Sequence, residues 1–410
     1  MYRFSSVYQS PKGSPIRALY KHLSEPGMIS FAGGYPDPQL FDVQGLGAAS
    51  ERAFANSKAC LEYGPTEGTS GLKEALVQLM QQRGVHTRPE NLIVTTGSQQ
   101  AFDLVLRVLV EKGDSVFVEQ PTYSTNIQAV QAHQAQLTAV PVTAEGMDVQ
   151  ALAHMLESAS AQGKTPKLLY TIPNFSNPSG ATLSLERRMR LLQLAVQYQV
   201  VLVEDDPYGG LRFAGEAVPS LMALASQVPG AQNWVVHMSS LSKIVAPGLR
   251  VGWAVAPEEI LKRCSVAKQS ADVGSSPWIQ GIAAEYLASG RLDTHLAHIC
   301  AAYGAKCRAL AQGLRQELGD AIRFHEPSGG MFVWARLTGD ITAAELLTHA
   351  IARGVMFVPG AGFQADGTDD FTLRLSFASP TLEEVAQGCK RLGEAMAAAR
   401  AAKNKQAQPA

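Results

Sequence analysis

Short apolar runs alternate with helical segments through the middle of the chain. Each run is followed by a polar turn and then by a segment with apolar positions three or four residues apart, a pattern typical of repeated β-α units. Five runs have this form: 92–95, 115–119, 168–172, 200–204 and 234–238. Strands joined through helices lie parallel, so the pattern predicts an α/β fold with a mainly parallel sheet and flanking helices.

The pattern changes on both sides of this region. Residues 41–90 and 258–318 are largely helical, whereas the C-terminal part mixes strands and helices and predicts a smaller α+β domain. Apolar or alternating segments mark its strands at 321–325, 331–335, 355–358 and 371–377. The expected organisation is an N-terminal arm with part of the small domain (1–40), a large domain (41–295), a C-terminal small domain (296–400) and a disordered tail (401–410).

Composition narrows the class of protein. The 410 residues suit two domains; 46% are hydrophobic, 17% are charged and the formal net charge is −1, as in a globular enzyme and unlike a nucleic-acid-binding chain. No apolar run has the roughly 18 residues of a membrane span, and the first residues lack the apolar core of a secretory signal, so we expect a cytoplasmic protein. The five cysteines and nine histidines form no metal-type cluster.

The stretch 238–253 carries the first candidate chemistry. Lys243 follows the apolar run 234–238 and lies between Ser240, Ser242 and Arg250. In open α/β sheets, ligands bind at the carboxyl ends of the strands. A lysine amine forms a Schiff base with an aldehyde, and hydroxyls with a guanidinium bind phosphate. This set therefore predicts a site for an aldehyde that carries a phosphate.

Other strand ends carry compatible groups. Ser98 and Gln99 lie in a turn that opens a helix, where free backbone N–H groups attract an anion. Asp205 ends an apolar strand and needs a cationic or donor partner if it is buried. Asp206 is the neighbouring alternative, and we prefer Asp205. Arg374 lies in an alternating strand, where a guanidinium suits a carboxylate, although a solvent-facing arginine is the simpler interpretation of this residue alone.

Taken together, these motifs resemble those of fold-type I, pyridoxal-phosphate (PLP) dependent aminotransferases of class I/II, most closely the branch with 2-aminoadipate and kynurenine aminotransferases. The resemblance runs in family order from Gly33 to Arg374. It implies that Lys243 holds PLP and that Asp205 holds its ring nitrogen. It also implies that Asn177, in an Asn-Pro-x-Gly turn, and Tyr208 contact the phenolic oxygen.

The resemblance assigns the remaining site residues as well. It makes Lys243, Asp205 and Tyr208 the catalytic group, Tyr123 the ring that stacks on the cofactor, and Tyr63 a phosphate contact in the partner's site of a homodimer. The substrate contacts that it implies are Arg374, which binds the α-carboxylate, together with Asn177, Gly34 and Arg17.

The implied activity is transfer of an amino group from an L-amino acid (2-aminoadipate, aromatic or aliphatic) to a 2-oxo acid such as 2-oxoglutarate. The same apparatus also serves PLP-dependent lyases and racemases. A PLP-binding regulatory protein is a further alternative, because such lobes also occur fused to DNA-binding domains. The residues before the first motif are too few for a winged helix, which argues against that alternative.

Overall fold

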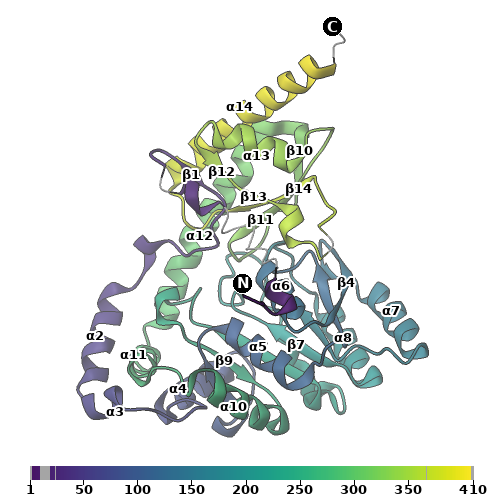
Figure 1. Cartoon of the computed structure of the whole chain (residues 1–410). Coiled ribbons are helices and arrows are strands. Elements are labelled where there is room, and N and C mark those ends of the chain that lie inside the picture. The colour runs from purple at the N-terminus through teal and green to yellow at the C-terminus, as the bar shows by residue number, and fades with distance from the viewer. Residues whose placement is uncertain (1, 10–18, 24, 366, 408–410) are drawn as a thin grey trace.

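The large domain is built on a twisted eight-stranded sheet in a computed structural model that describes residues 2–9, 19–23, 25–365 and 367–407 (Figure 1). The strand order is β2-β9-β8-β7-β6-β3-β4-β5. The strands are β2 (Leu92–Thr95), β3 (Ser115–Gln120), β4 (Gln136–Thr143), β5 (Gly146–Met147), β6 (Leu168–Thr171), β7 (Val201–Asp205), β8 (Val235–Ser240) and β9 (Gly252–Val255).

The central strands pair in parallel, which confirms the predicted mainly parallel sheet. All five apolar runs form strands, namely β2, β3, β6, β7 and β8. The antiparallel strand β9, between β2 and β8, was not predicted. Its first two residues, Gly252 and Trp253, belong to the lysine stretch 238–253, so no separate apolar run marked this strand. Strand β4, between β3 and the short edge strand β5, was also not predicted, because partly exposed and polar positions interrupt its apolar pattern.

Both faces of the sheet are covered. Neighbouring residues of one strand enter different cores: Tyr170 packs in the larger cluster with Phe102, and Leu169 packs in the second with Leu202. This burial on both faces explains why the strands are continuous apolar runs. The covering and peripheral helices are α2 (Val43–Phe54), α3 (Ser57–Leu61), α4 (Ser70–Gln82), α5 (Ser98–Leu109), α6 (Ser124–Ala132), α7 (Val149–Ala161), α8 (Leu185–Tyr198), α9 (Leu221–Leu224), α10 (Glu258–Asp272) and α11 (Pro277–Ala288).

A smaller domain stands beside the carboxyl ends of the central strands, and α12 (Leu292–Leu318) runs into it from the large domain (Figure 1). Its antiparallel sheet has the order β10-β11-β14-β13. The strands and helices are β10 (Ile322–Phe324), β11 (Phe332–Leu337), β12 (Val355–Met356), β13 (Val358–Pro359), β14 (Thr372–Ser376), α13 (Ala343–Ile351) and α14 (Leu382–Ala407). Because β1 (Ile29–Ser30) pairs with β12, the N-terminal segment joins this domain. The expected boundary at 295 falls inside α12.

The C-terminal tail differs from the expectation. Residues 401–410 were predicted to be disordered, but α14 continues as a helix to Ala407, and residues 408–410 lie outside the described residues. The last turns consist mainly of alanine, lysine and glutamine, which have high helix propensity, so they extend the helix beyond the body of the domain (Figure 1). In the described part of the chain, no helix is both long and apolar enough to span a membrane.

Candidate active site

A cavity of about 250 Å³ opens at the carboxyl ends of β7 and β8. It brings together twelve of the predicted site residues: Gly34, Ser98, Gln99, Tyr123, Asn177, Asp205, Tyr208, Ser240, Ser242, Lys243, Arg250 and Arg374. A larger cavity of about 930 Å³ lies between the β3–β4 edge and the small domain, with Trp334 and Arg336 in its wall. The smaller cavity is the candidate site because the groups with chemistry converge there.

Lys243 lies in the turn after β8, and its side chain crosses to the N-terminal segment. Its Nζ donates a hydrogen bond to the Gly34 carbonyl oxygen at 2.9 Å. Burial, with the nearby charges of Arg374 and Arg250, lowers the pKa of Lys243 to about 8. A substantial fraction of this amine is therefore neutral near pH 7 to 8, the form that acts as a nucleophile or a base.

Asp205 ends β7 and points into the cavity with only 5% of its surface exposed. Its Oδ2 accepts a hydrogen bond from the Tyr170 hydroxyl at 2.7 Å, whereas its Oδ1 has no partner among the described residues. Burial raises the pKa of Asp205 to about 6, although the bond from Tyr170 opposes the rise. A buried carboxylate oxygen without a partner suits a cationic N–H donor in the cavity.

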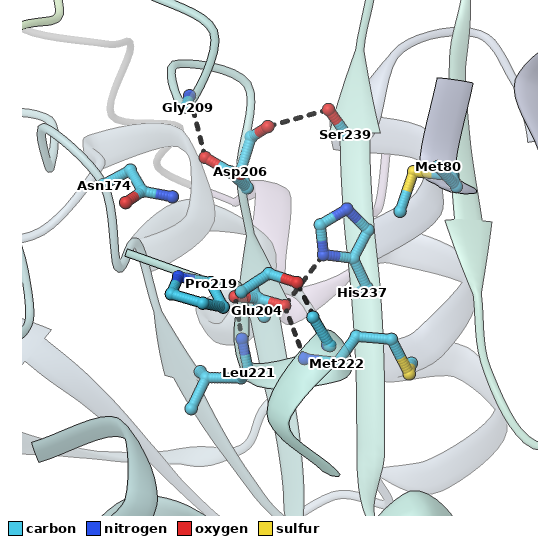
Figure 2. Close-up of polar contacts among 12 residues, drawn as sticks. Met80, Asn174, Glu204, Asp206, Gly209, Pro219, Leu221, Met222, His237 and Ser239 are labelled. Carbon is cyan, nitrogen blue, oxygen red and sulfur yellow. Dashed lines mark hydrogen bonds and ion pairs between the residues drawn. The ribbon is translucent and has the colours of Figure 1, made fainter. Parts of the chain in front are cut away.

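Asp206, the neighbouring alternative, is turned into its own loop. Its Oδ1 accepts from the Gly209 backbone N–H at 2.9 Å, and its carbonyl oxygen accepts from the Ser239 hydroxyl at 2.7 Å (Figure 2). Asp206 is buried but does not line the cavity. The geometry therefore favours Asp205 as the group that faces a ligand.

Glu204 and His237 form a buried pair on the other face of β7 and β8 (Figure 2). His237 Nδ1 lies 2.8 Å from Glu204 Oε2, and Glu204 also accepts from the backbone N–H groups of Leu221 and Met222. Burial raises the pKa of Glu204, but these bonds and the His237 charge outweigh it and leave the pKa below its ordinary value. This pair holds the start of α9 against the sheet, and neither residue lines the cavity.

The other end of the cavity suits a phosphate. Gly97 precedes α5 with φ +85°, and a Cβ there would lie 2.8 Å from Arg250 Nη2. Among the described residues no side-chain cap bond closes the start of α5, so its first N–H groups can bind an anion. Ser240 and Ser242 hold their hydroxyls 2.8 Å apart, and Arg250 is steered by a bond to the Thr96 carbonyl oxygen at 3.1 Å.

Arg374 closes the cavity on the small-domain side. It is 1% exposed; its Nη1 donates to Asn177 Oδ1 at 2.8 Å and its Nη2 to the Ala32 carbonyl oxygen at 2.7 Å. The guanidinium also lies over the rings of Phe332 and Phe363, at 4.3 and 4.7 Å. Arg374 is therefore a preorganised cation at the cavity and not the solvent-facing arginine considered from sequence.

Asn177 connects this arginine to Tyr208. Its Nδ2 donates to the Tyr208 hydroxyl at 3.4 Å, while its Oδ1 accepts from Arg374. Burial raises the pKa of the Tyr208 phenol far above its ordinary value, so this hydroxyl stays protonated and is a donor for an oxygen in the cavity.

One predicted residue that the structure describes is not brought to this cavity. Tyr63 is 84% exposed and lines a separate surface cavity of about 510 Å³ with Trp278. Arg17 lies outside the described residues. Conversely, the bond from Tyr170 to Asp205 and the place of Tyr35 in the cavity wall were not predicted. Only the register of β6 against β7 reveals Tyr170, because the two residues are 35 positions apart.

These groups fit PLP in their chemistry. Lys243 offers an amine for the aldehyde, Asp205 an acceptor for a protonated ring nitrogen, and the α5 start with Ser240 and Arg250 an anion site. Tyr123, half-buried, supplies an aromatic wall. The fold and the cavity together define a PLP-dependent enzyme of the α/β type.

Comparison with known proteins gives the family. Residues 32–392 match the family described as "Aminotransferase class I and II", and the chain belongs to this family. It is 37% identical over 393 residues to aromatic-amino-acid aminotransferase 1 of Thermococcus litoralis, covering 95% of this chain and 93% of that protein.

Two solved structures share the fold over nearly the whole chain. Kynurenine aminotransferase of Pyrococcus horikoshii, in complex with PMP, gives a TM-score of 0.91 at 34% identity, covering 96% of this chain and 97% of that one. Alpha-aminoadipate aminotransferase of Thermus thermophilus, complexed with N-(5'-phosphopyridoxyl)-L-leucine, gives 0.88 at 36% identity, covering 97% and 98%. This protein is a PLP-dependent transaminase of amino acids, and PLP is its cofactor.

Proposed function

We propose that the enzyme takes the amino group from L-amino acids of several kinds, including 2-aminoadipate, aromatic and aliphatic ones, and passes it to a 2-oxo acid such as 2-oxoglutarate. One observation carries this proposal. Lys243, Asp205 and Arg374 line a single cavity, which puts an amine, a partner for a pyridine nitrogen and a binder of carboxylate within reach of one ligand.

Each residue has a proposed role. Lys243 holds PLP and later moves a proton at the substrate's α-carbon; Asp205 keeps the ring nitrogen protonated; Asn177 and Tyr208 hold the phenolic oxygen. Bound PLP supplies an electron sink for the charge left when that proton departs. Arg374, with Asn177, positions the substrate through its α-carboxylate. The residues proposed to hold the phosphate and the ring face are Ser98, Gln99, Ser240, Ser242, Arg250 and Tyr123.

The broad donor range is supported by the relatives, which are named for aromatic amino acids, kynurenine and alpha-aminoadipate. The cavity agrees with such a range, since Gly34 and Tyr35, rather than a fixed charged pair, line its N-terminal side. Arg17 is the residue proposed to meet a distal carboxylate, as in 2-aminoadipate or 2-oxoglutarate.

We also propose a cytoplasmic homodimer in which Tyr63 reaches the phosphate site of the partner. The surface around Tyr63 is apolar, as an interface between subunits requires: Leu61 is 69% exposed, and Phe54 contacts Trp278 with ring centroids 5.3 Å apart. All five cysteines are free thiols, which suits the reducing cytoplasm.

A panel of amino donors tests the activity. L-phenylalanine, L-kynurenine, L-2-aminoadipate and L-leucine are each incubated with 2-oxoglutarate or pyruvate, and the 2-oxo acids, glutamate, alanine and ammonia are measured. We expect glutamate in equal amount to each 2-oxo acid, with 2-oxoglutarate the better acceptor. Ammonia without glutamate would indicate a lyase, and D-amino acids would indicate a racemase.

A further inference from the structure

The turn that carries Asn177 helps to position the side chains of two other site residues, Arg374 and Tyr208. Asn177 is 4% exposed, and its side chain bonds both the Arg374 guanidinium and the Tyr208 hydroxyl. A shift of this turn therefore moves the substrate-facing cation. The turn belongs to the connection between β6 and α8, which has no regular structure of its own, so its position depends on what fastens it.

One fastening comes from Glu119 at the end of β3. This side chain is 1% exposed; its Oε1 accepts from the Thr171 hydroxyl at 2.5 Å and its Oε2 from the Ser176 hydroxyl at 3.1 Å. Ser176 is the residue directly before Asn177. Glu119 thus ties the end of β6 and the start of the Asn177 turn to one buried carboxyl group, without lining the cavity itself.

The second fastening comes from Arg188 in α8, which is fully buried. Its Nη2 donates to the Pro173 carbonyl oxygen at 3.0 Å and to Asn174 Oδ1 at 2.6 Å, and its Nε donates to the Leu183 carbonyl oxygen at 3.0 Å. One planar guanidinium therefore holds both ends of the connection between β6 and α8.

The same guanidinium also links this connection to the segment that precedes α9. Arg188 Nη1 donates to the Pro219 carbonyl oxygen at 3.0 Å. Pro219 is two residues before Leu221, the first residue of α9. The connection that carries Asn177 is thus fixed to the sheet through Glu119 and to the segment before α9 through Arg188.

We propose that Glu119 and Arg188 are positioning residues for the transamination: they fix the Asn177 turn, and through Asn177 they fix the guanidinium of Arg374 that receives the substrate carboxylate. This inference rests on the proposed role of Arg374. Neither residue lines the cavity, so neither touches a ligand there, and the geometric link to the site runs through the turn. Loosening the turn weakens carboxylate binding in the ground state and the transition state alike, which raises KM more than it lowers kcat.

The test uses the PLP-loaded enzyme with an amino donor from the panel and, in parallel, the amine that lacks its α-carboxylate. Glu119→Ala, Ser176→Ala and Arg188→Lys each remove part of the fastening. We expect KM for the amino acid to rise about 5- to 10-fold, with kcat per bound PLP within about threefold. Activity toward the amine stays at the wild-type level. Glu119→Gln keeps the shape and can still bond both hydroxyls, with Oε1 accepting from one and Nε2 donating to the other, so its KM stays close to the wild-type value.

Asp206→Asn is the matched control, because it changes another buried carboxyl group, one that bonds the Gly209 N–H of its own loop rather than the Asn177 turn. We expect its KM to stay at the wild-type value even if its stability falls. If Glu119→Ala does not fold, Ser176→Ala and Arg188→Lys decide alone. Unchanged KM in both overturns the inference, as does an equal loss of activity toward the amine.

Arg374→Lys separates this inference from the function on which it rests. A large rise in KM for the amino acid in Arg374→Lys, together with the expected rise in the three variants, supports both. If Arg374→Lys raises KM and the three variants do not, the positioning role is wrong and the proposed function stands. If Arg374→Lys leaves KM unchanged, the role proposed for Arg374 is wrong, and the inference falls with it.

Discussion

The two ends of the cavity are built in different ways. At the ring end, Asp205 and Tyr208 are each 5% exposed, and a side chain from β6 bonds the carboxylate. At the phosphate end, Arg250 and Gln99 are exposed, and the other donors are backbone N–H groups at the start of α5 and the buried hydroxyls of Ser240 and Ser242. One end thus depends on a single buried charge, and the other on several donors, of which some are exposed to solvent.

Because of this difference, we expect the two ends to control different properties of the enzyme. Interactions among buried charges are strong because the surrounding dielectric constant is low, so one changed charge at the ring end alters the electronic state of the cofactor. At the phosphate end, the loss of one donor leaves the others in place, and solvent replaces part of the interaction. We therefore expect changes at the ring end to affect the rate, and changes at the phosphate end to affect cofactor affinity.

The largest expected effect comes from Asp205→Asn. The amide is nearly isosteric but carries no charge to hold a protonated ring nitrogen, so we expect kcat to fall about 100-fold at saturating PLP. Steady-state assays with bound PLP measured by absorbance check this. Asp206→Asn is the control, since Asp206 bonds its own loop and does not line the cavity. Similar losses in both variants would contradict the assignment of Asp205.

Site residues could be predicted from the sequence where they lie close to a strand end in the chain. Contacts between residues that are distant in the chain could not be predicted. The residues from Ser240 to Arg250 lie at and after the end of β8, Asp205 ends β7, and Asn177 follows β6. The strand ends alone therefore placed them at one edge of the sheet. The Tyr170–Asp205 bond depends on the register of two strands, and no local pattern encodes it.

The same reasoning explains the elements that were missed. β9 was hidden because its strand residues overlap the lysine motif, and its place between β2 and β8 is a property of the assembled sheet. The Glu119–Ser176 contact joins positions 57 residues apart, so neither residue stood out in the sequence. In both cases tertiary packing, and not local preference, determines the structure.

A smaller effect is expected from Tyr63→Phe, which tests whether the partially solvated phosphate end is completed by a second subunit. Loss of one hydroxyl donor to a phosphate should weaken PLP binding roughly 10-fold and leave kcat at saturating PLP within about twofold. Titration of the cofactor-free enzyme with PLP measures this. Tyr198→Phe, at the end of α8, serves as the control. Unchanged PLP affinity in Tyr63→Phe would argue against a site shared between subunits.

The smallest effect is expected from Tyr170→Phe, and its sign follows from the Asp205 environment. The Tyr170 hydroxyl donates to Asp205 Oδ2 and so stabilises the ionised carboxylate, which opposes the rise in pKa caused by burial. Without this donor the pKa of Asp205 rises further. Since the ionised form is the one that holds a protonated ring nitrogen, activity is then lost at a higher pH as the solution is acidified.

One hydrogen bond to a charged group corresponds to a shift of about 0.5 to 1 pH unit in the acid limb of kcat/KM. The pH profile of Tyr170→Phe between pH 5 and 8 measures this shift against the wild type. The Tyr63→Phe profile is the matched comparison, because that change acts at the phosphate end and leaves the Asp205 environment intact. A shift of the Tyr170→Phe limb to lower pH, or an equal shift in both variants, would contradict the idea that the two ends are controlled separately.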